Sequence, residues 1–197
     1  MSHARHIQRS LMTTRSAHTS PALSRTQVIA KCALLTALLI VSCFVTVPIG
    51  PVPFTLQTAV VILIALLCSP REAAVATGAY LVMGAVGLPV FSGMTGGIIR
   101  ASTGFLAGFL IGAVCASGLR LLLAKLRLPA VAADVIAAVV YMLIADALGL
   151  LWYVFFANVS PAEAFAIMVL PFIAVDCIKA VVAIIAAGAV RKALGWH

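Results

Sequence analysis

The chain has 197 residues, of which 64% are hydrophobic and 9% are charged, and its formal net charge is +8. Soluble domains carry roughly 25% charged residues, so this composition excludes a water-soluble fold and predicts a protein of the lipid bilayer. The cations lie between apolar runs and form no basic face with interleaved aromatic residues, which argues against a nucleic-acid partner.

Residues 1–24 form a polar, basic segment, which we predict to be a disordered cytoplasmic tail because its composition cannot bury a core. Residues 25–197 are predicted to form one all-α membrane domain. Its six transmembrane segments lie at about 26–47, 55–68, 70–87, 103–124, 130–156 and 161–190. The second segment is short for a full span, and the prolines of VPIGPVPFT, residues 47–55, exclude a regular helix before it.

Three local patterns predict how these helices begin and pack. SPRE, residues 69–72, and SPAE, residues 160–163, both predict capping boxes, in which serine caps the helix and glutamate bonds back to the serine backbone. In the fourth segment Gly104, Gly108 and Gly112 recur every fourth residue, which favours close packing against another helix. On the first helix Ala33 and Ala37 have the same spacing, which alone is a weak signal for a docking stripe.

The positions of the Lys and Arg residues test the predicted order in which the segments cross the membrane. If the N-terminus is cytoplasmic and each segment crosses, all of the 13 Lys and Arg residues except Arg100 and Lys179 fall on the cytoplasmic side. The sequence therefore predicts a multi-pass protein of the cytoplasmic membrane with both termini inside. Asp134 is expected near the start of the fifth helix, where the helix dipole favours an anion and Arg127 is close in sequence.

Asp176 and Lys179 share one face of the last helix because they are three residues apart. A charge in a spanning segment costs roughly 2.5–3.5 kcal/mol on insertion scales, so the two residues form either a structural ion pair or the polar floor of a ligand site. We favour the ligand site. Asp146 either caps or pairs locally, or it faces the same cavity.

Arg100 closes the glycine-rich stretch FSGMTGGIIRASTGF, residues 91–105. This stretch is either a plain loop or a wall over a pocket, where glycines such as Gly96 and Gly97 let the backbone approach a ligand closely.

The chain has no GxxxxGK[ST] phosphate loop, so it cannot hydrolyse ATP by that route. Its five cysteines have neither a CxxC pair nor a nearby histidine, so no metal site is predicted, and the charges fit ligand binding better than an enzyme.

Four motifs carry a family resemblance: VPIGPVPFTLQT (residues 47–58), GAVGLPVFSGMTGG (84–97), STGFLAGFLIGA (102–113) and the Asp176-x-x-Lys179 pair. In this order, over nearly all of residues 26–192, they closely resemble the biotin-specific S component of energy-coupling-factor (ECF) transporters, the BioY family. The resemblance implies a six-helix, S-component-like bundle that captures biotin from outside. It implies an irregular proline-rich first loop, and a glycine-rich loop between helices 3 and 4 that covers the ligand.

The resemblance also implies roles for individual residues. Asp176 and Lys179 are expected to contribute to the biotin site, and Ala33 and Ala37 to the surface that docks an EcfT-like transmembrane coupling subunit. Separate ATPase subunits would supply the energy, so the chain itself needs no cofactor. By position and chemistry we add Arg100, Gly96 and Gly97 to the expected biotin site.

Two other functions stay open from the residues alone. One is a secondary transporter in which Asp146 and Asp176 carry protons or cations, and the other is a small intramembrane transferase, against which the lack of metal-ligand spacing argues. The sequence does not decide whether the chain works alone, as a homo-oligomer or with an energising module. It also does not decide whether Arg100 or Lys179 binds the biotin carboxylate.

Overall fold

The computed structural model describes residues 24–47 and 53–195, so the predicted tail lies, apart from Ser24, outside the described residues. The described chain is mostly helical, which confirms the predicted all-α class. Its helices are α2 (Arg25–Ser42), α3 (Gln57–Leu67), α4 (Pro70–Ala85), α5 (Thr103–Lys125), α6 (Ala130–Ala157), α7 (Pro161–Met168) and α8 (Ile173–Ala193). Two short antiparallel strands, β1 (Thr46–Val47) and β2 (Phe54–Thr55), flank the proline-rich segment.

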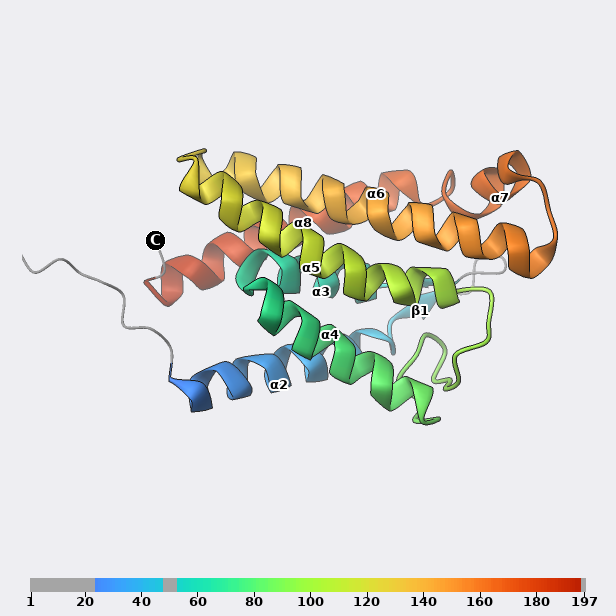
Figure 1. Ribbon diagram of the computed structural model, residues 1–197, viewed down its shortest axis with the longest axis horizontal. Coiled ribbons are helices and arrows are strands. Elements are labelled where there is room, and N and C mark those ends of the chain that lie inside the picture. Colours follow the sequence, from blue (N-terminus) through green and yellow to red (C-terminus); the bar gives the residue numbers. More distant parts are fainter. Residues whose placement is uncertain (1–23, 48–52, 196–197) are drawn as a thin grey trace, which may run out of the picture.

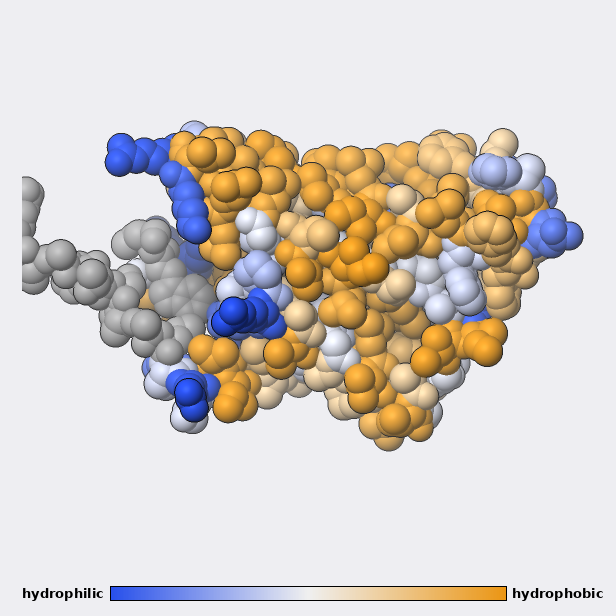
Figure 2. Space-filling model, viewed as in Figure 1, coloured by the Kyte–Doolittle hydropathy of each residue, from blue (hydrophilic) through white to orange (hydrophobic). Residues whose placement is uncertain are grey.

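The helices form a bundle in which successive helices from α2 to α6 alternate in direction and α8 returns alongside (Figure 1). One end of the bundle holds the start of α2, the α3–α4 and α5–α6 turns and the end of α8, and we call it the basic end. We call the opposite end the loop end. Figure 2 shows a broad apolar band between the two ends. Within the described residues, α2, α5, α6 and α8 are long and apolar enough to cross a membrane.

The short second segment is confirmed as α3, whose 11 residues rise only about 16 Å, against roughly 30 Å for the hydrocarbon core. Its shortness is compatible with a membrane protein because α3 lies inside the bundle, packed against α8, α5 and α2. Val61, Ile62, Ile64 and Ala65 are all fully buried. A helix that is hydrophobic on every side is the kind that other helices surround.

The prediction of a single helix over residues 161–190 is wrong. α7 ends at Met168 and α8 begins at Ile173, so the structure has seven helices in its described part where the sequence predicted six. Pro171 lies in the break. Proline lacks a backbone N–H and its ring clashes with the carbonyl four residues earlier, which interrupts a helix at this place. As a result Asp176 lies in the first turn of α8, near the positive end of the helix dipole.

The glycine prediction for α5 is confirmed, and the partner is α6. A Cβ atom built on Gly104 would lie 2.3 Å from the carbonyl oxygen of Leu148, and one on Gly108 would lie 2.7 Å from the Cα atom of Ala145. At Gly112 it would lie 2.9 Å from the ring of Tyr141. Only glycine leaves room for this approach, so the three positions set the distance between the two helices.

The basic end is held by buried ion pairs that the sequence did not identify. Asp134 is fully buried and pairs with Arg120, whose Nε lies 2.8 Å from Oδ1, and with the guanidinium of Arg191. Arg127, the cation closest in sequence, lies in the α5–α6 turn with a φ of 61° and is not among the ion-pair partners of Asp134. The Asp134 cluster therefore ties α5, α6 and α8 together.

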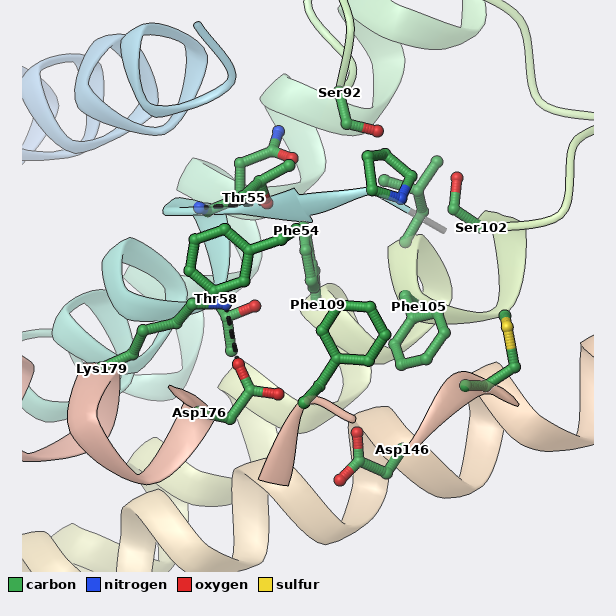
Figure 3. Close-up of a pocket in the computed structure, with 15 residues that line it drawn as sticks. Phe54, Thr55, Thr58, Ser92, Ser102, Phe105, Phe109, Asp146, Asp176 and Lys179 are labelled. Atoms are coloured by element: carbon green, nitrogen blue, oxygen red, sulfur yellow. Dashed lines mark hydrogen bonds and ion pairs between the residues drawn. The ribbon is translucent and has the colours of Figure 1, made fainter. Parts of the chain in front are cut away.

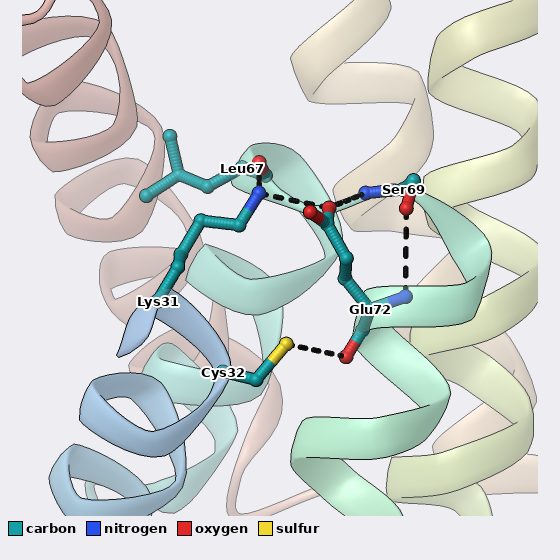
Figure 4. Close-up of polar contacts among 5 residues, drawn as sticks. All are labelled: Lys31, Cys32, Leu67, Ser69 and Glu72. Carbon is teal, nitrogen blue, oxygen red and sulfur yellow. Dashed lines mark hydrogen bonds and ion pairs between the residues drawn. The ribbon is translucent and has the colours of Figure 1, made fainter. Parts of the chain in front are cut away.

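A second ion pair joins α2 to α4 at the same end (Figure 4). Lys31 Nζ lies 2.8 Å from Glu72 Oε2 and also donates to the carbonyl of Leu67 at the end of α3. Glu72 Oε2 accepts from the Ser69 backbone N–H as well, which completes the predicted capping box. The Glu72 carboxylate therefore caps the N-terminus of α4 and also links α4 to α2 through Lys31.

The other predicted capping box is only half formed. The Ser160 hydroxyl accepts from the backbone N–H of Glu163 at 3.2 Å, but no bond returns from the Glu163 side chain, which is exposed. An additional capping box, which the sequence reasoning missed, starts α2, where the Ser24 and Gln27 side chains each bond the other residue's backbone.

The α5–α6 contact predicts different effects for the same substitution at two helical glycines. Gly108→Ala places a methyl group against the α6 backbone and should lower the free energy of unfolding by about 1–3 kcal/mol. Gly188→Ala on α8 meets nothing within 4 Å and should be neutral or stabilising by up to about 1 kcal/mol. Thermal unfolding in detergent measures both. A Gly108→Ala protein as stable as wild type would contradict the close α5–α6 contact.

Candidate ligand-binding cavity

A cavity lies in the loop-end half of the bundle, between β2, α3, α5, α6 and α8 (Figure 3). Its walls are aromatic and apolar, with neutral polar groups on one side and three ionisable groups on α6 and α8. The apolar lining consists of Pro53, Phe54, Phe105, Leu106, Phe109, Met168 and Phe172, the neutral polar lining of Thr55, Gln57, Thr58, Ser92 and Ser102, and the ionisable lining of Asp146, Asp176 and Lys179. Ligand sites typically combine apolar walls with a few placed polar groups in this way.

Asp176 and Lys179 meet in this cavity as the sequence predicted. Lys179 Nζ lies 2.7 Å from Asp176 Oδ1, and their side chains are only 6% and 15% exposed. The ammonium also lies 4.0 Å from the centroid of the Phe54 ring, within the range of a cation–π interaction. Both contacts stabilise a charge that would otherwise be costly in so apolar a place.

Asp146 lines the cavity from α6 (Figure 3). This confirms the interpretation that Asp146 faces the same cavity as Asp176 and Lys179. No hydrogen bond or ion pair of its carboxylate occurs among the described residues. Asp146 is thus a carboxylate in the cavity wall without the cationic partner that Asp176 has.

Arg100, Gly96 and Gly97 do not line the cavity. The Arg100 guanidinium donates to the Thr95 hydroxyl within the same loop, and the Arg100 carbonyl accepts from Trp152 Nε1 at 2.8 Å, which fastens the loop to α6. Gly96 packs on the Gly87 backbone, since a Cβ atom there would lie 2.6 Å from the Gly87 carbonyl, and Gly97 has a φ of +90°. Both glycines therefore shape the loop, while Ser92 and Ser102 of the same segment reach the cavity.

Sequence reasoning missed the contribution of the end of the proline-rich stretch and the start of α3. Phe54, Thr55, Gln57 and Thr58 all line the cavity. The available signal was three polar residues, Thr55, Gln57 and Thr58, at and just before the start of an otherwise apolar helix. Gln57 is 2% exposed, and its side-chain amide donates to the hydroxyl of Tyr80, which is fully buried.

The cavity encloses about 60 Å³, room for only a few water molecules. Sites for small organic ligands usually measure about 300–1,000 Å³. A ligand of that size therefore has to displace lining side chains or the loop at residues 86–102.

The two buried tyrosines make a matched test of the hydrogen bond behind the cavity. Tyr80→Phe leaves the Gln57 amide without its partner and should lower the free energy of unfolding by about 1–3 kcal/mol. Tyr141 is also fully buried, but its hydroxyl has no partner among the described residues, so Tyr141→Phe should be neutral or stabilising. Equal losses of thermal stability in the two variants would contradict this difference.

A helical membrane bundle that encloses an ion pair within aromatic walls has the architecture of a membrane protein that binds a small polar solute. The BioY family model matches residues 12–196, so the chain belongs to the BioY family. This confirms the resemblance seen in the sequence motifs.

Individual relatives agree with the family match. The chain is 40% identical to biotin transporter BioY of Thermotoga maritima over 86 residues, which are 42% of this chain and 51%, about half, of that relative. It is 36% identical to biotin transporter BioY2 of Lactococcus lactis over 166 residues, which are 82% of this chain and 88% of that one. The crystal structure of the S-component for biotin from an ECF-type ABC transporter superposes with a TM-score of 0.80 at 26% identity. That match covers 87% of this chain and 95% of the other.

Proposed function

We propose that this chain is the substrate-binding S component of an ECF-type transporter and captures biotin for uptake across the cytoplasmic membrane. The observation that carries the proposal is the cavity of a BioY-family chain in which Asp176 and Lys179 pair beside the Phe54 ring. In this role the chain binds and delivers a solute and is not an enzyme.

Biotin matches the chemistry of the lining group by group. Its ureido ring offers two N–H donors, which suit the acceptor oxygens of Asp176. Its thiophane ring and valeryl chain suit the aromatic walls. Its carboxylate needs a cation, and we assign this role to Arg100. Lys179 already pairs with Asp176, whereas the one described partner of the Arg100 guanidinium is the neutral hydroxyl of Thr95.

The loop between α4 and α5 is the part we expect to move when biotin enters. It carries Arg100, Gly96 and Gly97, and its Ser92 and Ser102 already touch the cavity. A shift of this loop would enlarge the cavity and bring the Arg100 guanidinium toward the ligand. In this proposal Gly96 and Gly97 act by allowing the loop its shape.

Equilibrium binding of labelled biotin to the purified chain in detergent tests the assignment. We expect saturable binding that unlabelled biotin displaces and that dethiobiotin, lipoate and thiamine displace less well. Asp176→Asn should weaken binding by about 10–100-fold, because a hydrogen bond to a charged group is worth about 1.5–3 kcal/mol. Glu163→Gln, at an exposed acid on α7, is the control and should bind as wild type. A folded wild-type protein that does not bind biotin would overturn the proposal.

The energy for uptake is proposed to come from a transmembrane coupling subunit and its ATPases. A groove of about 560 Å³ runs between α2 and α4, and it is lined by Ala33 and Ala37, both exposed, together with apolar residues such as Val75 and Met83. Small residues let a partner helix approach the backbone closely. We propose this groove as the docking surface for the coupling subunit.

Tryptophan substitutions on one helix test the docking surface. Ala33→Trp or Ala37→Trp fills the groove and should abolish co-purification with a co-expressed coupling subunit and ATPase pair, while biotin binding by the chain alone is retained. Ala30→Trp is the matched control, because Ala30 is exposed on α2 but does not line the groove. Normal co-purification of the Ala37→Trp protein would contradict docking at this surface.

The basic end is proposed to face the cytoplasm, which places both termini inside. Among the described residues, Arg25, Lys31, Arg71, Arg120, Lys125, Arg127, Arg191 and Lys192 lie at or near the helix ends on this side. Such an excess of cations is typical of cytoplasmic loops. The cavity would then open toward the outside, where biotin is captured.

A further inference from the structure

Asp146 stands apart from the other acids near the membrane-spanning helices. Asp134 and Glu72 pair with cations at the basic end, and Asp176 pairs with Lys179 in the cavity. Asp146 lines the same cavity with no hydrogen bond or ion pair from any described residue. The cavity lining thus holds two carboxylates and one ammonium, so ionised Asp146 leaves it with one negative charge in excess.

The elements packed around Asp146 offer it no compensating charge. α8 contributes Asp176, Lys179 and Cys177, of which the only cation is already paired. Phe105 and Phe109 of α5, Met168 of α7 and Gln57 of α3 are uncharged. On α6 itself, Tyr141 is fully buried and its hydroxyl bonds no described group. Arg100, in the nearby loop, bonds the Thr95 hydroxyl and does not reach the cavity lining.

The other side of Asp146 faces an apolar groove between α6 and α8. The groove measures about 510 Å³ and is lined by side chains such as Val139, Leu143 and Val181, and apart from Cys177 its only ionisable lining groups are Asp146 and Asp176. The bilayer core holds no water, so this apolar groove supplies none to the carboxylate. The water that hydrates ionised Asp146 therefore has to come from the cavity.

A bound ligand removes that water and adds a negative charge. Biotin carries its own carboxylate, and Arg100 and Lys179 together can balance only that carboxylate and Asp176. An ionised carboxylate left in a dry, apolar site without a cation is strongly disfavoured, whereas its protonated form is neutral and can donate a hydrogen bond.

We propose that Asp146 takes up a proton when biotin binds, so that the cavity closes on the ligand with Asp146 neutral. The proposal rests on the biotin assignment and extends it: the chain binds biotin and one proton together. By linkage, biotin affinity then falls as pH rises, by up to about tenfold per pH unit for one proton, over the range in which Asp146 is ionised in the free protein.

Isothermal titration calorimetry of the full chain with biotin tests this directly. Titrations from pH 5.5 to 9, each in two buffers with different ionisation enthalpies, count the protons taken up per biotin bound. For wild type we expect an uptake that approaches one proton toward the alkaline end and a dissociation constant that rises with pH. Asp146→Asn should bind with no proton uptake and an affinity that no longer follows pH. Glu163→Gln is the matched control and should keep the wild-type proton uptake.

The outcomes separate this inference from the proposed function. Absence of biotin binding by folded wild-type protein would remove the biotin assignment itself. Biotin binding without proton uptake at any pH would overturn only the role of Asp146, and that result needs no variant to fold. Proton uptake that persists in Asp146→Asn would place the proton elsewhere and would equally overturn the inference.

Discussion

The close approach of α5 and α6 is the contact on which the rest of this bundle depends. Gly108 lies against Ala145, and the neighbouring residues Phe109 and Asp146 both line the cavity. A larger side chain at Gly108 would separate the two helices where they form the cavity wall. The helix contact that holds the bundle together therefore also positions part of the ligand site.

The acids that form ion pairs or line the cavity in the described part of the chain divide into two groups by their distance from the basic end. Near that end the acids Glu72 and Asp134 each bind a cation on another helix and so fasten neighbouring helices together. In the cavity the one ion pair among the described residues, Asp176 with Lys179, lies within a single helix and leaves Asp146 unpaired. The first arrangement stabilises the fold, and the second keeps polar groups available to a ligand.

The short helix α3 connects these two regions. It begins with Gln57 in the cavity lining, and its last residue, Leu67, accepts a hydrogen bond from Lys31 at the basic end. Lys31 belongs to α2, the helix that also carries Ala33 and Ala37. The proposed ligand site and the proposed docking groove thus lie on elements that pack directly against each other, although the two share no lining residue.

The sequence by itself determined the features that depend on local chemistry. Apolar length predicted the membrane helices, the spacing of Gly104, Gly108 and Gly112 predicted a close helix contact, and a separation of three residues placed Asp176 and Lys179 on one face. Pro171 indicated the break before α8, because proline interrupts a helix. The break was missed because the apolar residues continue on both sides of Pro171.

Only the tertiary structure decided which distant residues meet. Asp134 binds Arg120 and Arg191 rather than Arg127, its neighbour in sequence, because helix packing, and not chain distance, brings those guanidinium groups to it. The same packing put Phe54 over Lys179, left Arg100 on Thr95 outside the cavity lining, and placed Asp146 in the cavity without a cation. Periodicity along one helix specifies a face but carries no information about the helix that will cover it.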